Sequence, residues 1–327
     1  MHICIVGGGG MGSLYGGLLA RSGIEVTLVD TWAEHMAAIK TDGLHLDGIT
    51  GDLHIPLNTA TTAAEVAPAD IAFIQVNTYA TRDAAESAKA VLKDDGYAIT
   101  LQNGIGNLEQ MREVLGDARV LGGLSYHSAA VHGPGHVSHT HAGPTWLGEL
   151  DGSRTPRLTT LDEMLKAAGF APVIVDDIVA YIWNKFIHNS AINPVCAVTG
   201  LRVGEIPRTP SADTLQTRIV EEALAVVAAK GVTMPDDDPM QTIKDFCKPK
   251  FNKPSMLQHI EQGKRTEVEA LNGAIVREGQ ALGIPTPYNQ ALAWMVQAIE
   301  TQSRPERLGD PVDYDALEAE LRGAALQ

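Results

Sequence analysis

The chain has few cysteines, and their positions exclude a disulfide framework. Among its 327 residues only Cys4, Cys196 and Cys247 are cysteines, and no two of them form a Cys-x-x-Cys pair. An odd number of widely separated cysteines is typical of a protein that stays in a reducing compartment. We therefore expect a cytoplasmic protein without structural disulfides.

Long apolar runs and a basic amino-terminal segment are also absent. No apolar stretch reaches the roughly 20 residues that a membrane-spanning helix needs. The first residues, MHICIVGGGGMG, turn to glycine almost at once and carry no basic segment, unlike a secretory signal peptide. The sequence thus predicts no membrane partner, in agreement with a cytoplasmic location.

Positive charge is scarce, which argues against a nucleic-acid partner. The chain has 25 Lys and Arg against 40 Asp and Glu, a formal net charge of −15, and such a field repels a polyanion. We interpret its one lysine run as a solvated helix end and loop; it comprises Lys244, Lys248, Lys250 and Lys253. At about 150 residues per domain, the length predicts two domains.

A glycine-rich loop near the start predicts a dinucleotide site. The loop consists of Gly7, Gly8, Gly9, Gly10, Met11 and Gly12. It follows a short apolar stretch typical of a buried strand, 2–6, and precedes a helical pattern that ends near Ser22. In G-x-G-x-x-G the glycines permit a tight turn, a close approach to pyrophosphate and close helix–strand packing. A bare glycine turn is the alternative, but the strand–loop–helix context favours dinucleotide binding.

Asp30 closes the next predicted strand, Glu25 to Val29, and bears on cofactor choice. A carboxylate there can accept hydrogen bonds from the ribose hydroxyls of NAD and would repel the 2′-phosphate of NADP. No Arg or Lys occurs in the following residues, 31–35. Asp30 could instead only cap the next helix, and the two roles can coexist. The sequence favours NAD(H) over NADP(H).

Two asparagines follow later strands of the first half. Asn77 comes after the predicted strand 70–76, and Asn103 after the predicted strand 97–101. In doubly wound sheets, ligands bind at the carboxyl ends of the strands. Position favours a binding role for Asn103, whereas for Asn77 a turn role is equally consistent.

Five histidines lie in a β-rich stretch, 119–148, and a metal site is one interpretation of such a cluster. They are His127, His132, His136, His139 and His141. Their spacing matches no His-Glu-x-x-His motif, no cysteine is near, and alternation along strands would divide them between two faces. We expect polar hairpin histidines and no metal.

After the predicted strand 172–175 the composition changes to helical patterns with no further strand alternation. The candidate helices cover 178–200, 211–230, 238–247, 254–262, 265–282 and 287–302. The sequence therefore predicts an α/β fold in two parts, a dinucleotide-binding domain over 1–178 and an all-helical domain over 179–327. The final segment, about 303–327, is acidic and helix-prone.

The first of these helices carries a polar stripe. Lys185, Asn189 and Asn193 follow one another at intervals of four, so they share one helix face among apolar neighbours. An exposed polar face is the ordinary interpretation. One ammonium and two amides in such apolar company favour a buried functional face.

A second polar cluster runs from Lys253 to Gly273. Ser255 and the pair Thr266-Glu267 are its notable members. From the residues alone, Ser255 is a possible helix cap and Thr266-Glu267 a modest helix-start signal.

Together these motifs resemble the ketopantoate reductase (2-dehydropantoate 2-reductase) family over nearly the whole chain. The matching elements are the glycine loop with Met11-Gly12-Ser13, Asn103-Gly104-x-Gly106, Lys185-x3-Asn189-x3-Asn193-Pro194, Pro254-Ser255-Met256-Leu257-Gln258 through Thr266-Glu267 and Asn272-Gly273, and Gly283-Ile284-Pro285-x-Pro287. The resemblance implies a Rossmann-like N-terminal domain, a helical C-terminal domain of the 6-phosphogluconate-dehydrogenase-like kind, a cleft between them, and a homodimer.

The resemblance also implies roles for individual residues. Lys185 would be the general acid that protonates the 2-oxo oxygen, and Glu267 would hydrogen-bond the same centre. Asn189, Asn193 and Ser255 would bind the substrate, and Asn103 the cofactor ribose. A positioned ammonium suits this chemistry because hydride addition to a ketone creates an alkoxide.

The expected function is therefore reduction of a 2-oxo acid by a nicotinamide cofactor, with ketopantoate as the first substrate. Many relatives have a lysine near Asn77 and a basic residue near Asp30 that holds the NADP phosphate, and this chain has neither; His259 also replaces a frequent Asp. An NADH-dependent D-2-hydroxyacid dehydrogenase of the D-mandelate type is the alternative within the superfamily. A non-catalytic dinucleotide sensor is the alternative of another class.

Overall fold

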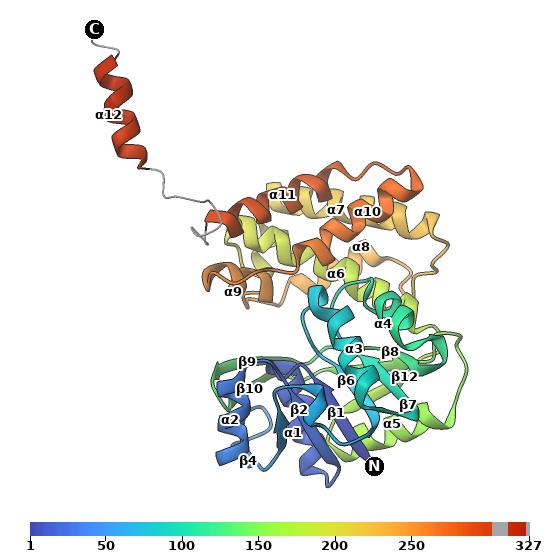
Figure 1. Cartoon of the computed structure of the whole chain (residues 1–327). Helices are drawn as coiled ribbons and strands as arrows, with labels where there is room; N and C mark the ends of the chain where they lie inside the picture. Colours follow the sequence, from blue (N-terminus) through green and yellow to red (C-terminus); the bar gives the residue numbers. More distant parts are fainter. Residues whose placement is uncertain (303–312, 325–327) are drawn as a thin grey trace. The chain divides into compact units, whose positions relative to one another are not determined.

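The computed structural model describes residues 1–302 and 313–324, which form two compact units (Figure 1). The first unit contains Met1–Asn189 and Val227–Pro239; the second contains Ser190–Val226 and the chain from Met240 onward. Helix α6 contributes to both, since it runs through Ile178–Thr199. The domain boundary at 178/179, at the start of this helix, stays a prediction.

The first unit is built around an eight-stranded sheet in the order β12-β11-β8-β7-β6-β1-β2-β5. Its strands are β1 His2–Val6, β2 Glu25–Val29, β5 Asn58–Ala60, β6 Ala69–Ile74, β7 Leu92–Thr100, β8 Val120–Ser125, β11 Pro144–Gly148 and β12 Ala171–Ile174. The six neighbouring strands β8, β7, β6, β1, β2 and β5 are parallel to one another, and β11 is antiparallel to β8. Parallel order places the carboxyl ends of β1, β6 and β7 at one edge.

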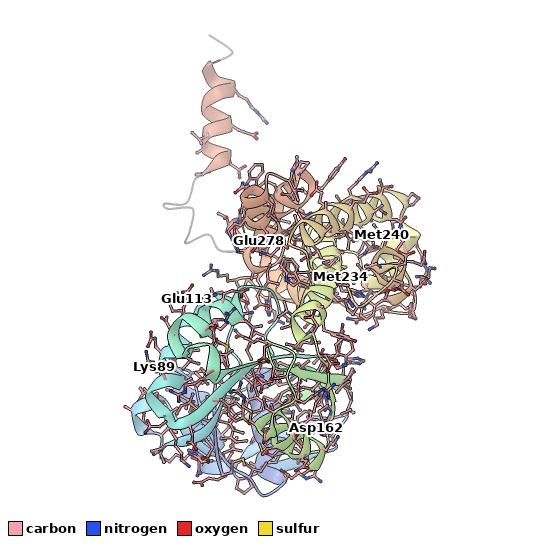
Figure 2. The ribbon with its side chains drawn as sticks, turned by 90° about the vertical axis from the view of Figure 1, so that its right-hand side faces the viewer. Lys89, Glu113, Asp162, Met234, Met240 and Glu278 are labelled. Atoms are coloured by element: carbon pink, nitrogen blue, oxygen red, sulfur yellow. The ribbon has the colours of Figure 1, made fainter. Side chains whose placement is uncertain are left out.

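Helices cover both faces of this sheet. They are α1 Gly10–Arg21, α2 Ala33–Asp42, α3 Thr81–Val91, α4 Asn107–Leu115 and α5 Pro156–Ala167, with short 3-10 turns at η1 Ala63–Glu65, η2 Thr78–Ala80 and η3 Asp117–Arg119. Figure 2 shows α3 and α4, marked by Lys89 and Glu113, on one side of the sheet and α5, marked by Asp162, on the other. The predicted doubly wound architecture is therefore confirmed.

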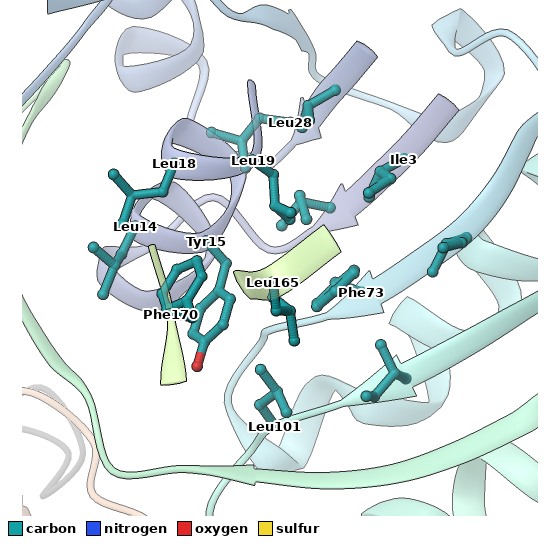
Figure 3. Packing of buried hydrophobic residues seen from close by; sticks show 14 of the residues in the cluster. Ile3, Leu14, Tyr15, Leu18, Leu19, Leu28, Phe73, Leu101, Leu165 and Phe170 are labelled. Carbon is teal, nitrogen blue, oxygen red and sulfur yellow. The ribbon is translucent and has the colours of Figure 1, made fainter. Parts of the chain in front are cut away.

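Alternation along β1 assigns its side chains to two separate cores. Ile3 and Ile5 join a cluster with α1 and α5, whereas Cys4 and Val6 join a cluster with α3 and α4. In the first cluster the rings of Tyr15 and Phe170 stack with centroids 4.2 Å apart (Figure 3). The first cluster packs α1, and with it the glycine loop, against the sheet.

A second, smaller sheet has the order β4-β3-β10-β9. Its strands are β3 Leu44–Gly48, β4 Leu53–Ile55, β9 Ser128–Gly133 and β10 His136–His141. Two hairpins, β3–β4 and β9–β10, are joined by parallel pairing of β3 with β10. Leu44, Leu46 and Val137 point from one face of this sheet into the core of the first unit.

The described part of the second unit consists of helices without strands, as predicted. Its elements are η4 Val203–Arg208, α7 Pro210–Ala229, α8 Pro239–Cys247, α9 Ser255–Glu261, η5 Val268–Ala270, α10 Asn272–Leu282, α11 Pro287–Gln302 and α12 Tyr314–Ala324, with the ends of α7 and α8 reaching the first unit. The helix-prone tail forms α12; 303–312 and 325–327 lie outside the described residues. No described helix is long and apolar enough to cross a membrane.

One predicted helix, 265–282, is wrong in its first half. Regular helix begins only at Asn272, after the short turn η5. The backbone N–H of Thr266 donates to Glu300 Oε1 at 2.7 Å, and the Thr266 hydroxyl accepts from the N–H of Val268. The second bond takes the N–H of Val268 away from its helical partner, and the first ties the backbone of Thr266 to α11.

Candidate active site

The glycine loop connects β1 to α1 in a conformation that side chains would prevent. Gly7 has φ of +105°, and a Cβ at Gly12 would lie 1.8 Å from the carbonyl oxygen of Gly7. A Cβ at Gly9 would meet nothing within 4 Å, and Gly9 caps α1 without any side-chain hydrogen bond. The backbone at Gly9, where α1 begins, therefore lies beside open space. This arrangement fits the pyrophosphate of a dinucleotide.

Asp30 lies at the end of β2 beside this loop. Its Oδ2 accepts a hydrogen bond from Gly8 N at 2.6 Å, and its Oδ1 accepts one from Trp32 N at 2.9 Å. The carboxylate therefore fixes the loop as well as the start of α2. A carboxylate offers about four acceptor positions, so two remain for other donors.

His35 on α2 supports the glycine loop through Ser13, a role that was not predicted from the sequence. Its side chain is fully buried; Nδ1 accepts from Gly135 N at 2.8 Å, and Nε2 lies 3.2 Å from Ser13 Oγ. Because Ser13 Oγ donates to Gly8 O, Nε2 must carry the proton that His35 gives to Ser13. Burial lowers the pKa of His35, so the ring is neutral near pH 7 and supplies no positive charge beside Asp30.

Asn77 and Asn103 lie at the ends of the adjacent parallel strands β6 and β7. Asn77 is exposed, and its Nδ2 donates to Tyr79 Oη at 2.9 Å. Asn103 is half-buried, and its backbone carbonyl accepts from Asn107 Nδ2 at 2.9 Å and from Thr78 Oγ1 at 3.2 Å. The loop after β7 is thus held by side chains from α4 and η2.

Gln102 anchors the same edge, and the sequence analysis had given it no role. Its Nε2 donates to Val76 O at 2.6 Å and to Thr81 Oγ1 at 2.9 Å, while its Oε1 accepts from Thr100 Oγ1. These bonds tie the end of β7 to the end of β6. A hollow of about 160 Å³ beside it extends under α4 toward Ile182 and Trp183, and neither the glycine loop nor Lys185 lines it.

Lys185 projects from α6 onto the end of β8. Its Nζ donates to the carbonyl oxygen of Ser125 and lies 5.3 Å from the ring centroid of Tyr126. The Ser125 hydroxyl in turn accepts from Tyr15 Oη at 2.8 Å, and Tyr15 Oη lies 2.5 Å from Thr145 Oγ1. A buried chain of hydroxyls therefore fixes the strand end that holds the ammonium group.

Asn189, one helical turn beyond Lys185, contacts Asn103. Its Nδ2 donates to Asn103 Oδ1 at 3.4 Å, a long contact. The first unit thus brings together a lysine and two amides predicted from separate motifs. An ammonium and neutral amides can bind and protonate a carbonyl oxygen.

The remaining predicted residues belong to the second unit. Asn193 is half-buried on α6, Ser255 is exposed at the start of α9, and Glu267 is half-buried at the start of η5. The possible cap role of Ser255 is wrong, because Pro254 occupies the cap position and no side chain caps α9. Asn272, by contrast, is buried and connects α10 to two other helices: its Nδ2 donates to Ser190 O of α6 and to Asn289 Oδ1 of α11.

Strand alternation separates the histidines of 127–141, as predicted. His139 is buried with Val137, whereas His136 shares the opposite face of β10 with Ser138. His127 and His139 lie 3.0 Å apart through Nδ1 and Nε2, and burial lowers the pKa of His127 to about 4. Among the described residues, no candidate metal cluster is drawn from this segment alone.

The chain is similar to known proteins over most of its length. The family model described as "Ketopantoate reductase PanE/ApbA" matches residues 3–152, and "Ketopantoate reductase PanE/ApbA C terminal" matches residues 177–300. The 2-dehydropantoate 2-reductase of Pyrococcus horikoshii is 34% identical over 303 residues, covering 92% of this chain and 98% of that protein. That of Archaeoglobus fulgidus is 33% identical over 300 residues, covering 92% and 98%.

Two solved structures extend the comparison. A PanE/ApbA family ketopantoate reductase from Ralstonia eutropha JMP134 matches with a TM-score of 0.87 and 32% identity, covering 93% of this chain and 100% of that one. D-mandelate dehydrogenase with NADH and anilino(oxo)acetate matches with a TM-score of 0.87 and 27% identity, covering 93% and 99%.

Proposed function

The chain belongs to the ketopantoate reductase family, an oxidoreductase family, and we propose that it reduces ketopantoate to pantoate, a step of pantothenate biosynthesis. The relatives' activity supports the substrate, and the family supports a nicotinamide cofactor. The observation that carries the chemistry is Lys185, held by the Ser125 carbonyl beside Asn103 and Asn189. A sensor without catalysis would have no use for this lysine.

We assign the proton donor of the reaction to Lys185. When bound, the nicotinamide would supply a hydride to C2 of the 2-oxo acid. The Lys185 ammonium would stabilise the negative charge that develops on the C2 oxygen and give it a proton, which produces the 2-hydroxy acid. The neutral lysine would then recover a proton from water.

The other predicted residues take supporting roles in this proposal. Glu267 would hydrogen-bond the reacting centre as the second catalytic group, and Asn189, Asn193 and Ser255 would bind the substrate. The loop glycines with Met11 would hold the pyrophosphate, and Asp30, Asn77 and Asn103 would hold the rest of the cofactor. The open space over Gly9 and the position of Asp30 support this assignment.

We further propose NADH as the preferred cofactor. Asp30 retains two acceptor positions for ribose hydroxyls, and His35 on α2, which interacts with Asp30, is neutral. A 2′-phosphate would meet a carboxylate and no cation from residues 31–35. A cytoplasmic homodimer stays a prediction; the three buried free thiols are consistent with that compartment.

The second candidate is an NADH-dependent D-2-hydroxyacid dehydrogenase of the D-mandelate type. It is favoured by the likeness to D-mandelate dehydrogenase, whose structure holds NADH, together with the carboxylate of Asp30. Few side chains around a pocket decide between an aliphatic and an aryl 2-oxo acid.

One assay panel distinguishes the two candidates. NADH and NADPH oxidation would be followed with ketopantoate, 2-oxoisovalerate, 2-oxoisocaproate and benzoylformate. The highest kcat/KM for ketopantoate supports the proposal, and the highest value for benzoylformate supports the second candidate. Absence of turnover with all four substrates would refute both.

A further inference from the structure

The side chains of three histidines, His54, His45 and His136, form a row across the small sheet, outside the glycine loop. His54 on β4 pairs with His45 on β3, and His45 pairs with His136 on β10. The ring centroids are 4.5 Å apart for His45 and His54 and 4.1 Å apart for His45 and His136. Facing register positions project from the same side of a sheet, so the row lies opposite the buried Leu44 and Leu46.

Two carboxylates complete this row. His136 Nε2 lies 2.8 Å from Asp47 Oδ2, and His45 Nε2 lies 2.8 Å from Asp52 Oδ1. The Ser138 hydroxyl also donates to Asp47, which orients that carboxylate. Two triads result, His45–Asp47–His136 and His45–Asp52–His54, and within each triad the ligand atoms all lie within 4.8 Å of one another.

We propose that His45, Asp47 and His136 bind a divalent transition-metal ion of the Zn²⁺ class. Imidazole nitrogens with a carboxylate oxygen are typical ligands of Zn²⁺ and Co²⁺, whereas Mg²⁺ prefers oxygen ligands alone. Metal–ligand distances are about 2.0–2.2 Å, so small side-chain rotations would bring the three ligand atoms close enough to a shared ion. A water molecule would complete a four-coordinate site.

Exposure favours this triad over the other one. The side chains of His45, Asp47 and His136 are 30%, 31% and 33% exposed, whereas that of Asp52 is 77% exposed. Ligands that are already ordered lose less side-chain entropy on binding. The Asp47 carboxylate is also oriented by Ser138, in the way that outer hydrogen bonds orient metal ligands elsewhere.

The ion would join two hairpins that the chain makes separately. Asp47 and His136 are 89 positions apart and belong to different hairpins, linked only by the β3–β10 pairing within this sheet. Metal binding would therefore stabilise the small sheet against opening. The sequence prediction of no metal considered only the histidines of 127–141, and the site takes two of its three ligands from outside that segment.

Titration of the full-length protein with Zn²⁺ and Co²⁺, after removal of metal with a chelator, tests this proposal. Calorimetry would measure affinity, Co²⁺ absorption would report the ligand field, and NMR would follow the histidine side-chain nitrogens. We expect His45→Ala, His136→Asn and Asp47→Asn each to weaken binding by about tenfold or more. Binding should also raise the melting temperature.

Two matched variants serve as controls. His54→Ala removes a ring of the row but no ligand of the proposed triad, and His141→Ala removes an exposed histidine at the end of the same sheet. Both should retain wild-type affinity. Equal affinity of His136→Asn and the wild type, or loss of binding in His54→Ala, would overturn the assignment, as would absence of Zn²⁺ binding to the wild-type protein.

Discussion

The Lys185 ammonium is held in position by groups that take no part in the proposed reaction. It is directed by the Ser125 carbonyl, and Ser125 is fixed by Tyr15 through a buried hydroxyl. Burial raises the pKa of Tyr15 far above its ordinary value, so this hydroxyl stays protonated and donates at any working pH. The lysine therefore depends on the first core of the first unit for its position.

Removal of the lysine side chain should affect turnover much more than cofactor binding. For Lys185→Ala we expect kcat to fall on the order of 10²–10⁴-fold, the usual contribution of a general acid. NADH affinity, measured by fluorescence titration, should stay within about threefold of wild type, because a residue that acts on the substrate oxygen contributes little to dinucleotide binding.

Lys166→Ala is the matched control for this substitution. Lys166 lies on α5, pairs with Asp162, and should change neither quantity. Loss of NADH binding together with turnover in Lys185→Ala would show a structural lysine and contradict the role assigned here.

Asp30 is expected to decide the choice between the two nicotinamide cofactors. In Asp30→Ala the ratio of kcat/KM for NADH to that for NADPH should fall by about tenfold or more, since a charged hydrogen bond is worth about 1.5–3 kcal/mol. Asp30→Asn separates the charge from loop positioning, because its amide oxygen can still accept from one backbone N–H. An unchanged cofactor ratio in both variants would exclude Asp30 as the determinant.

At the scale of elements, the β1–loop–α1–β2 unit was predictable because its signals are local. Strand ends and loop glycines were read from neighbouring residues, and the structure has β1 and β2 at the predicted positions. The helix over 265–282 failed in its first half because the Thr266 hydroxyl takes the N–H of Val268 and because Glu300, far along the chain, fixes the N–H of Thr266. His35 and Gln102 were missed for the same reason, since their partners come from distant segments.

The glycines of this unit should differ sharply in their tolerance of a methyl group. Gly12→Ala places a Cβ 1.8 Å from Gly7 O, and we expect it to lower the free energy of unfolding by about 1–3 kcal/mol through overpacking. Gly9→Ala meets nothing within 4 Å, so stability should change little while NADH affinity falls. Denaturant unfolding and NADH titration measure the two effects; equal stability of both variants would contradict this account.

At the scale of the whole molecule, the first unit contains neutral histidines, one half-buried and one buried. His127 has a pKa of about 4 because burial penalises its charge, and burial also lowers the pKa of His139. The pKa of an unfolded-chain histidine is about 6.5. Below that pH the unfolded chain binds a proton that the folded protein does not bind. The free energy of unfolding therefore decreases as the pH decreases.

Acid unfolding should therefore show a histidine-dependent slope. Between about pH 6.5 and 4 the free energy of unfolding should decrease as pH falls, and His127→Gln should reduce the slope in that window. Above pH 7 the variant should show no difference in slope. Denaturant melts at a series of pH values measure this; an unaltered slope in the variant would mean that other groups cause the acid sensitivity.

The pairing of β3 with β10 has a consequence for the order of folding. Each hairpin of the small sheet is local, but their junction joins Asp47 and His136, which are 89 positions apart, and closing so long a loop costs conformational entropy. The same junction places Gly135 against His35, which supports Ser13 and the glycine loop. The glycine loop therefore receives this part of its support only when the β3–β10 junction has formed.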